Sequence, residues 1–164
     1  MTPDDLVLTP AGVRFQGRLW PCTIGDSGVS GRKREGDGAT PRGVHRIIGM
    51  LYRPDRMARP ADWAKPIGPC DLWSDDVGDA EYNMMVRVPY APSHEKLRRA
   101  DPLYDLVILT DWNWPYAVKG RGSAIFIHQF LRPSSPTRGC VAFSRSHLRQ
   151  IAGRIRYRTR LIVP

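Results

Sequence analysis

The amino-acid sequence predicts a mainly β fold: a β-sandwich or partly closed barrel of mixed sheets with one or two short helices. Many short apolar segments alternate like half-buried strands, and turn-forming residues separate them, since 15 glycines and 15 prolines are spread along the 164 residues. The regular succession of strands and helices that a parallel doubly wound sheet requires is missing. With 41% hydrophobic residues, the whole chain, 1–164, is expected to fold as one domain around its own core.

The first part of the chain predicts two strand-forming regions around a long loop. Residues 6–25 (LVLTPAGVRFQGRLWPCTIG) alternate between apolar and polar positions and are interrupted by two glycines, which predicts a hairpin. Residues 25–43 are polar and rich in glycine, so we expect a loop there. Residues 44–54 (VHRIIGMLYRP) predict a strand, and the proline-rich residues 55–69 predict irregular structure.

The middle of the chain predicts three strands and a short helical segment. Residues 82–90 (YNMMVRVPY) predict a strand that ends near its proline. Residues 93–104 (SHEKLRRADPLY) predict one or two helical turns, with Ser93 as the N-cap and an acidic residue in the first turn. Strong strands are expected at 104–113 (YDLVILTDWN) and 123–130 (SAIFIHQF).

The end of the chain predicts a helix followed by an outer strand. Residues 144–155 (SRSHLRQIAGRI) carry leucine and isoleucine at helical spacing, and Ser144 or Ser146 can cap the helix. Residues 156–163 (RYRTRLIV) alternate, which predicts a strand with one wet face. That face would carry Arg156, Arg158 and Arg160.

Charge and composition limit the classes of partner. The formal net charge is +9, from 25 Lys and Arg against 16 Asp and Glu, but the chain has no block of five like charges. Either a soluble basic surface or binding of an anionic substrate accounts for this balance. No stretch approaches the roughly 18 apolar residues of a membrane span.

The N-terminus and the cysteines bear on location and on metal chemistry. The opening residues MTPDDLVL are acidic and lack the basic and apolar regions of a signal peptide, so we expect a cytoplasmic protein, or a periplasmic one if the native start lies upstream. Three widely spaced cysteines make no disulfide framework, and the scattered histidines make no structural zinc site.

The segment IFIHQFLRPSSPTRGCVAF, residues 125–143, brings one histidine and one cysteine close together in the chain. His128 ends an apolar strand, and Cys140 follows Gly139 at a turn that leads into another apolar run. A thiol is a weak nucleophile until a base or an imidazolium converts it to thiolate, and a sharp turn aims successive N–H groups at one point, as in an oxyanion hole. A thiolate would make Cys140 the cysteine most readily alkylated at neutral pH. The alternative is a core histidine beside an inert buried thiol.

Two motifs resemble the L,D-transpeptidase (YkuD-type) catalytic domain family, and the resemblance covers about residues 20–155. The segment FIHQ…PTRGCVAF resembles its signature of a strand-end histidine, a loop and a Gly–Cys turn. The segment DGATPRGVHRI resembles its Thr-Pro-x-Gly segment, and LWSDD…YNMMV and GSAIFIHQF are similar to a short, single-domain branch. The matching positions are Thr40, Pro41, Gly43, Ile47, Thr137, Arg138, Gly139, Cys140 and Val141.

The resemblance implies a catalytic pair and a substrate. Cys140 would be the nucleophile and His128 the base, and the backbone carbonyl of Gln129 would orient the imidazole. At the turn that carries the cysteine, the candidate oxyanion donors are the N–H groups of Gly139, Cys140 and Arg138. Family enzymes use no metal, so no cofactor is expected. These enzymes attack the bond that follows the diamino acid in peptidoglycan stem peptides. Ala142, where many members carry Arg or Asn, and a short loop between the histidine and the cysteine depart from the family pattern.

Substrate contacts are expected from five further residues. Thr137 and Arg138 flank the nucleophile, and the Arg138 guanidinium would favour a thiolate or bind a stem-peptide carboxylate; the alternative is a salt-bridged loop arginine. Asp76, Tyr82 and Asn83 match positions near the cleft in the short branch, where a carboxylate would hold a diamino acid amine; a polar turn is the alternative.

Three functions remain open from the sequence. We prefer an L,D-carboxypeptidase that trims tetrapeptides of recycled muropeptides, because a cytoplasmic enzyme would meet soluble fragments and water. The runner-up is a transpeptidase that forms peptidoglycan cross-links. The third is a basic binding module with Arg156, Arg158 and Arg160 as its footprint, but no aromatic residues interleave with these arginines and no nucleic acid is expected as partner.

Overall fold

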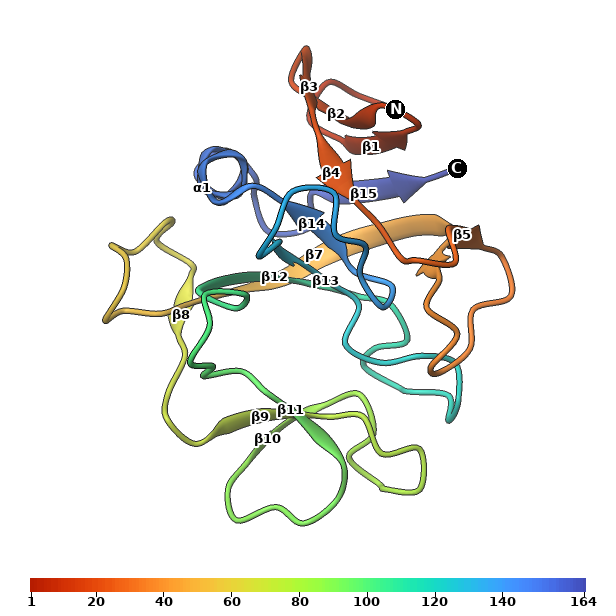
Figure 1. The fold of residues 1–164 in the computed structure, drawn as a ribbon, viewed down its shortest axis with the longest axis vertical. Coiled ribbons are helices and arrows are strands. Elements are labelled where there is room, and N and C mark those ends of the chain that lie inside the picture. The colour runs from red at the N-terminus through yellow and green to blue at the C-terminus, as the bar shows by residue number, and fades with distance from the viewer.

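A computed structural model describes all 164 residues, and its fold is mainly β with one helix (Figure 1). The strands and the helix are β1 (Leu6–Thr9), β2 (Gly12–Phe15), β3 (Arg18–Trp20), β4 (Cys22–Thr23), β5 (Val29–Ser30), β6 (Thr40–Pro41), β7 (Gly43–Tyr52), β8 (Lys65–Pro66), β9 (Asp71–Ser74), β10 (Met85–Arg87), β11 (His94–Lys96), β12 (Leu106–Thr110), β13 (Phe126–Gln129), β14 (Val141–Phe143), α1 (Arg145–Ala152) and β15 (Arg160–Val163).

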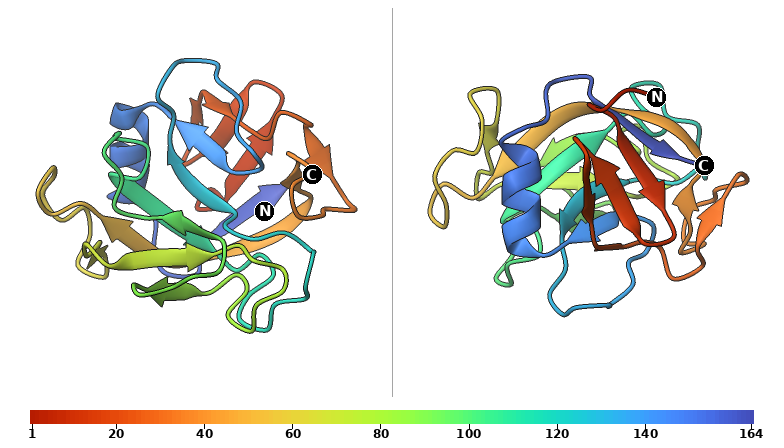
Figure 2. Two further views of the ribbon diagram at one scale, coloured as in Figure 1. Left: turned by 60° about the horizontal axis from the view of Figure 1, so that its bottom comes forward. Right: turned by 90° about the horizontal axis from the view of Figure 1, so that it is seen from above.

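Ten strands form one mixed sheet that curls almost into a barrel. Its order is β3-β2-β1-β15-β7-β12-β13-β14-β4, with β8 paired to β7. The pairs β1–β15, β13–β14 and β7–β8 are parallel, and the others are antiparallel. β4, at one end of the order, lies against β2 near the other end, and Figure 2 shows the resulting curvature. The predicted mainly β fold with a partly closed barrel and a short helix is therefore confirmed.

The main core fills the curled sheet and includes one face of α1. Leu148, Ile151 and Ile155 are buried, as the helical spacing predicted. Ser144 caps the helix, because its hydroxyl accepts the N–H of His147 at 3.2 Å. The helix packs beside β13 and β12, and it follows β14 after one residue.

A second, smaller core holds a three-stranded sheet against the main one. This sheet has the order β10-β9-β11 and lies apart from the barrel in Figure 1. Trp73 of β9 packs edge-on against Phe126 of β13, with ring centroids 5.0 Å apart. Leu97, Tyr104 and Cys140 belong to the same buried cluster. The three-stranded sheet is thus fixed to the strand that carries His128.

Two regions differ from the sequence predictions in the first hundred residues. The expected hairpin over 6–25 is a meander of three strands, β1 to β3, continued by β4. The expected helical turns over 93–104 are absent; residues 94–96 form β11, which pairs with β9. The edge of β9 offers this segment backbone hydrogen bonds, and such tertiary pairing outweighs a weak capping signal.

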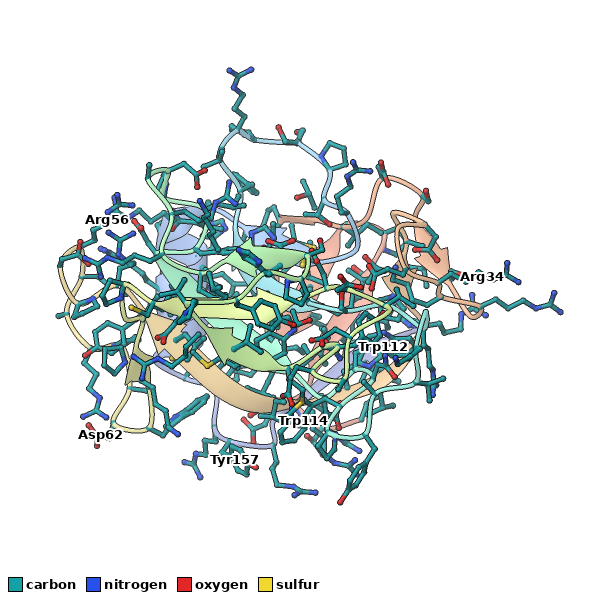
Figure 3. All side chains as sticks on the ribbon, turned by 90° about the horizontal axis from the view of Figure 1, so that it is seen from below. Arg34, Arg56, Asp62, Trp112, Trp114 and Tyr157 are labelled. Atoms are coloured by element: carbon teal, nitrogen blue, oxygen red, sulfur yellow. The ribbon has the colours of Figure 1, made fainter.

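The predicted strand over 156–163 is wrong in its first half. Arg158 has a positive φ of 68°, Tyr157 is exposed, and β15 begins only at Arg160. The guanidinium of Arg160 is bound to Asp5, so the three arginines do not line one strand face. Basic side chains instead lie scattered over the surface, with Arg34 and Arg56 on opposite sides in Figure 3. This removes the footprint on which a nucleic-acid-binding reading depended.

Candidate active site

The two sequence motifs meet at the turn that carries Cys140. The hydroxyl of Thr40 donates to the carbonyl of Gly139 at 2.9 Å, across 99 positions of sequence, and accepts the N–H of Gly25 at 2.9 Å. Gly139 has a φ of +134°, and a Cβ there would lie 2.8 Å from the carbonyl oxygen of Ala39. The turn therefore requires glycine, and Thr40 fixes it from the opposite motif.

Cys140 is buried directly before β14 and holds a protonated thiol. Its Sγ donates to the carbonyl of Ala124 at 3.1 Å and accepts the N–H of Phe126 at 3.3 Å. Burial raises the pKa of the Cys140 thiol to about 12. The structure thus differs from the expected thiolate, because the guanidinium of Arg138 is exposed to solvent whereas the sulfur is not.

His128 lies on β13 and is held in one tautomer. Its Nδ1 is 2.9 Å from the carbonyl of Gln129, the contact that the family resemblance implied. A carbonyl only accepts, so Nδ1 carries the proton and Nε2 keeps the basic lone pair. Burial lowers the pKa of His128 to about 4, so the imidazole is neutral at pH 7. The ring of Tyr104 packs edge-on against the imidazole, with centroids 5.4 Å apart.

Some backbone N–H groups of the turn at Cys140 are already hydrogen-bonded within the chain, and others are free to bind a ligand. The N–H of Gly139 donates to the hydroxyl of Thr137 at 3.1 Å, and that hydroxyl donates to the carbonyl of Cys140 at 2.6 Å. The N–H groups of Arg138 and Cys140 have no hydrogen-bond partner within the chain. Of the three candidate oxyanion donors, Gly139 is therefore the one already engaged, and the other two are available.

Cys140 and His128 line one cleft of about 840 Å³. Thr137 and Arg138, both expected to contact substrate, also lie on its wall. The remaining charged side chains on the wall are Asp26, Glu35, Asp75, Glu95, Arg99 and Arg132. Arg132 and Arg138 are exposed and take part in no ion pair, so the reading of Arg138 as a salt-bridged loop residue does not fit.

Three of the expected substrate-binding residues, Asp76, Tyr82 and Asn83, are not on the cleft wall. The carboxylate of Asp76 accepts the N–H groups of Gly78 and Ser93, at 2.8 and 3.2 Å, and so stabilises a turn. Tyr82 is buried, and its hydroxyl donates to Glu35 and accepts the N–H of Gly122 at 3.0 Å. Neither side chain is presented to a ligand in this cleft.

Asn83, the third such residue, is buried behind the cleft and supports Cys140 indirectly. Its side-chain oxygen accepts the N–H of Ala124 at 2.9 Å and the indole N–H of Trp73 at 3.0 Å. Its amide nitrogen donates to the carbonyls of Trp112 and Asn113. Because the Ala124 carbonyl accepts a hydrogen bond from the Cys140 thiol, Asn83 fixes the backbone that holds this thiol.

Among the wall residues that sequence reasoning missed are four from the middle of the chain, namely Asp75, Glu95, Arg99 and Tyr104. Tyr104 is buried, and its hydroxyl donates to Glu95 at 2.9 Å. Burial, together with the nearby negative charge of Glu95, raises the pKa of Tyr104 well above its ordinary value. All four come from segments that pattern analysis treated as a helix, a strand start or a polar turn, so their common location is a tertiary result.

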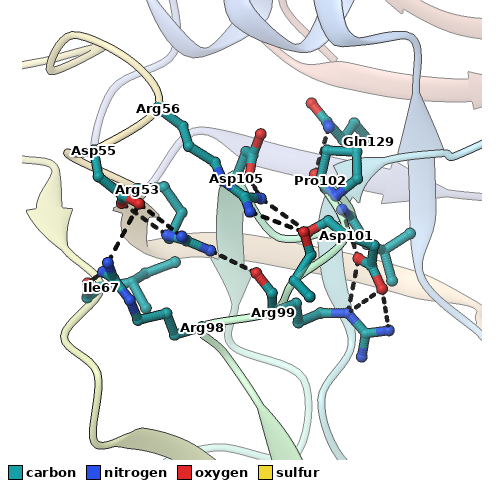
Figure 4. Close-up of polar contacts among 12 residues, drawn as sticks. Arg53, Asp55, Arg56, Ile67, Arg98, Arg99, Asp101, Pro102, Asp105 and Gln129 are labelled. Carbon is teal, nitrogen blue, oxygen red and sulfur yellow. Dashed lines mark hydrogen bonds and ion pairs between the residues drawn. The ribbon is translucent and has the colours of Figure 1, made fainter.

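A network of arginines and aspartates fixes the segment that carries Arg99 and Tyr104 (Figure 4). Arg53 donates to Asp55 and to the carbonyl of Arg99, and Arg99 is itself bound to Asp101. Arg56 donates to Asp105 at 2.8 Å. The Gln129 side chain adds a hydrogen bond to the carbonyl of Pro102. The residue whose backbone orients His128 therefore also anchors this segment.

The structure has no group of three or more His, Cys, Asp or Glu side chains arranged to hold a metal ion. Its one helix has eight residues and lacks the length and apolar character needed to cross a bilayer.

Comparison with known proteins gives one match. The family model described as the L,D-transpeptidase catalytic domain (YkuD) matches residues 8–163, which is almost the whole chain. Neither curated proteins nor solved structures give a significant match. The two motifs that meet at Thr40 and Gly139 both lie inside the matched range. The chain therefore belongs to the L,D-transpeptidase (YkuD) catalytic-domain family, a family of cysteine-based acyltransferases that modify peptidoglycan.

Proposed function

We propose that this chain is an L,D-carboxypeptidase that removes the terminal D-amino acid from the tetrapeptides of muropeptides. The observation that carries the proposal is the cleft that Cys140 and a tautomerically fixed His128 both line. The family acts on peptidoglycan through a cysteine, and Cys140 is the one cysteine of the chain on this wall. Cys140 is the proposed nucleophile and His128 the proposed base.

The neutral state of both groups shapes the proposed first step. Because burial keeps the thiol protonated and the imidazole neutral, proton transfer accompanies attack rather than preceding it. The thiol leaves its bond to the Ala124 carbonyl and gives its proton to Nε2 of His128. Sγ forms a bond to the carbonyl carbon of the diamino acid, and the oxyanion accepts the free N–H groups of Cys140 and Arg138.

The second half of the reaction returns the enzyme to its starting state. The tetrahedral adduct breaks its C–N bond, and His128 gives its proton to the leaving amine, which departs as the D-amino acid. Water then attacks the thioester and gives a proton to Nε2. The C–S bond breaks, and Sγ takes that proton back. One peptide bond and one water are consumed, and no redox change occurs.

The charged loop beside Cys140 supports a substrate with a free C-terminus. Arg132 and Arg138 lie on the exposed segment 131–138, line the cleft, and lack ion-pair partners. A terminal D-amino acid carries a carboxylate, which a guanidinium binds through paired N–H donors. Water needs no binding site of its own to reach a thioester beside this exposed loop, which favours hydrolysis.

Cross-link formation by transpeptidation is the second candidate, favoured by the acidic part of the cleft. Asp26, Glu35, Asp75 and Glu95 line it, and an acceptor stem peptide would bring an amine that carboxylates attract. Transpeptidation requires the bound amine to attack the thioester before water hydrolyses it.

Purified disaccharide tetrapeptide tests the two candidates. We expect the mass to fall by one alanine unit, with no change in the presence of the Cys140→Ala variant and normal turnover by Cys22→Ala. Dimers of two stem peptides would instead assign the chain to cross-linking. Unchanged substrate, both monomeric and cross-linked, would rule out acyl transfer on these peptides.

The cytoplasmic location, where soluble muropeptides would be the substrate, is a further proposal. Cell fractionation followed by detection of the native chain tests it. Recovery from the periplasm would favour the cross-linking candidate, because intact peptidoglycan lies outside the cytoplasmic membrane.

A further inference from the structure

Four carboxylates in the cleft lack a cationic partner, although the chain has a net charge of +9. They are those of Asp26, Glu35, Asp75 and Glu95. Outside the cleft wall, basic side chains bind Asp5, Asp37, Asp55, Asp71, Asp101, Asp105 and Asp111. A chain with surplus cations that leaves its cleft carboxylates unpaired indicates a site for a positively charged ligand group.

Two of these carboxylates lie together on one face of the three-stranded sheet. Glu95 of β11 is directly opposite Trp73 of β9, and Asp75 follows Trp73 by two positions. Side chains two positions apart share a face, so Asp75 and Glu95 are diagonal neighbours, about 7–8 Å apart at the backbone. Trp73 packs on Phe126 of β13, which turns this face toward the strand of His128.

Both carboxylates keep unused acceptor capacity. Oδ1 of Asp75 is buried and has no hydrogen-bond partner within the chain. Glu95 receives a single hydrogen bond, from the Tyr104 hydroxyl to Oε2. Arg99 also lines the cleft, but its guanidinium is bound to Asp101. Each carboxylate can therefore accept hydrogen bonds from an ammonium group, which has three donors.

We infer that Asp75 and Glu95 form an ammonium subsite, which recognises the free side-chain amine of the substrate's diamino acid. The inference rests on the proposed function, because it takes the cleft to bind a stem peptide. Glu95 lies in β11 and Asp75 directly follows β9, whereas Arg132 and Arg138 belong to the loop before Cys140, so amine and terminal carboxylate bind to different segments of the cleft. That separation of charge fixes the direction in which the peptide lies across Cys140.

The subsite also connects recognition with the nucleophile. Burial is the main cause of the raised pKa of the Cys140 thiol, and the negative charge of Glu95 adds to it. An ammonium bound at Glu95 offsets that charge, so the thiol loses its proton more readily when the correct substrate is present. Peptides without the free amine bind less tightly and leave this contribution to the pKa in place.

Binding to the catalytically inactive Cys140→Ala variant tests the subsite independently of turnover. The probes are a stem tetrapeptide with lysine at its third position and the same peptide acetylated on the lysine side chain. By calorimetry at pH 7 we expect the free amine to bind about 10- to 100-fold tighter, as for hydrogen bonds to charged groups. Adding Asp75→Asn or Glu95→Gln, which keep an acceptor oxygen, should bring this ratio toward one.

Glu81→Gln is the matched control, because Glu81 is an exposed carboxylate near the same sheet and outside the cleft. It should leave the ratio unchanged. Equal binding of the two peptides, or loss of the preference in Glu35→Gln but not in Asp75→Asn and Glu95→Gln, would overturn the inference. A preserved preference in binding, with no turnover by the unmodified enzyme, would contradict the proposed function alone.

Discussion

Gly139 shows why the cysteine motif requires a glycine directly before the thiol. Its positive φ places the turn in a region that L side chains avoid, and the carbonyl of Ala39 leaves no room for a Cβ. The turn orients the N–H of Cys140. The hydroxyl of Thr40, from a segment far away in sequence, donates a hydrogen bond to the carbonyl of Gly139. A single residue thus depends on two motifs for its geometry.

Thr40→Val is expected to destabilise the turn and slow turnover. Valine keeps the shape but leaves the buried carbonyl of Gly139 and the N–H of Gly25 without a partner, which costs about 1–3 kcal/mol. Misplacement of the thiol should lower muropeptide hydrolysis by about tenfold or more. Thr40→Ser keeps the hydroxyl and is the control. Equal activity of the two variants, with equal denaturation midpoints, would show that the hydroxyl is not needed.

Alkylation of Cys140 should be slow at neutral pH and should accelerate as the pH rises. The thiol reacts as thiolate, and burial raises its pKa to about 12, so the reactive fraction grows about tenfold per pH unit below that value. Peptide mass spectrometry after iodoacetamide treatment over a series of pH values from neutral upward measures this. A rate that levels off near pH 7 would instead indicate a stable thiolate–imidazolium pair.

At the scale of elements, the segment between β11 and β12 decides which side chains reach the active site. Tyr104 and Arg99 lie on it, and the arginine–aspartate network of Figure 4 holds it to the 53–56 turn. The sequence predicted helical turns at the start of this segment, because Ser93 could act as an N-cap and an acidic residue follows it in the first turn. The pairing of β11 with β9 is a long-range contact that no local pattern records.

Arg56→Met should destabilise the fold by about 2–4 kcal/mol. Asp105 is 3% exposed, and removing Arg56 would leave its buried carboxylate without its nearest partner. Arg46→Met is the control. The side chain of Arg46 is half-exposed, that of Asp111 is partly exposed, and their charged atoms are 3.9 Å apart. Such an exposed ion pair contributes under about 1 kcal/mol to stability. Urea denaturation measures both. Equal losses in the two variants would show that the network does not hold the segment.

At the scale of the whole molecule, the two ends of the chain close one side of the curled sheet. β1 and β15 pair in parallel, and the N- and C-termini lie near one another in Figure 1. The guanidinium of Arg160 binds Asp5 through two hydrogen bonds, at 2.8 and 2.6 Å. The barrel is therefore completed by a contact between residues that are 155 positions apart.

Acid should remove the stabilisation that the Asp5–Arg160 pair provides. The Arg160 hydrogen bond lowers the pKa of Asp5 from 3.8 to about 2, so the contribution is complete above pH 4 and is lost as the pH falls from 4 to 2. Asp5→Asn should cost about 1 kcal/mol at pH 7, because Arg160 is partly exposed. The cost should vanish once the pH falls below about 2, where Asp5 is protonated in the folded chain as well.

Thermal unfolding of Asp5→Asn and of Asp4→Asn at both pH values measures this effect. Asp4 makes no ion pair and is the control, with an expected change close to zero. A pH-independent difference between Asp5→Asn and the unmodified chain would contradict the assignment to this carboxylate.

The sequence by itself determined the fold class, most of the strands, the capped helix and the pair of Cys140 and His128. These depend on short-range alternation, on helical spacing and on turn residues, which lie within a few positions of each other. It also determined the carbonyl contact of Gln129 through the family resemblance. None of these required knowledge of which distant segments meet.

The tertiary structure alone decided the charge state of Cys140 and His128 and the composition of the cleft. Burial, which depends on packing from the whole chain, made the thiol and imidazole neutral. Strand pairing brought Asp75 and Glu95 to the wall and left Asp76 in a turn, one position away. A shift of one residue along a strand reverses the face of its side chain, and only the register of β9 against β11 fixes that choice.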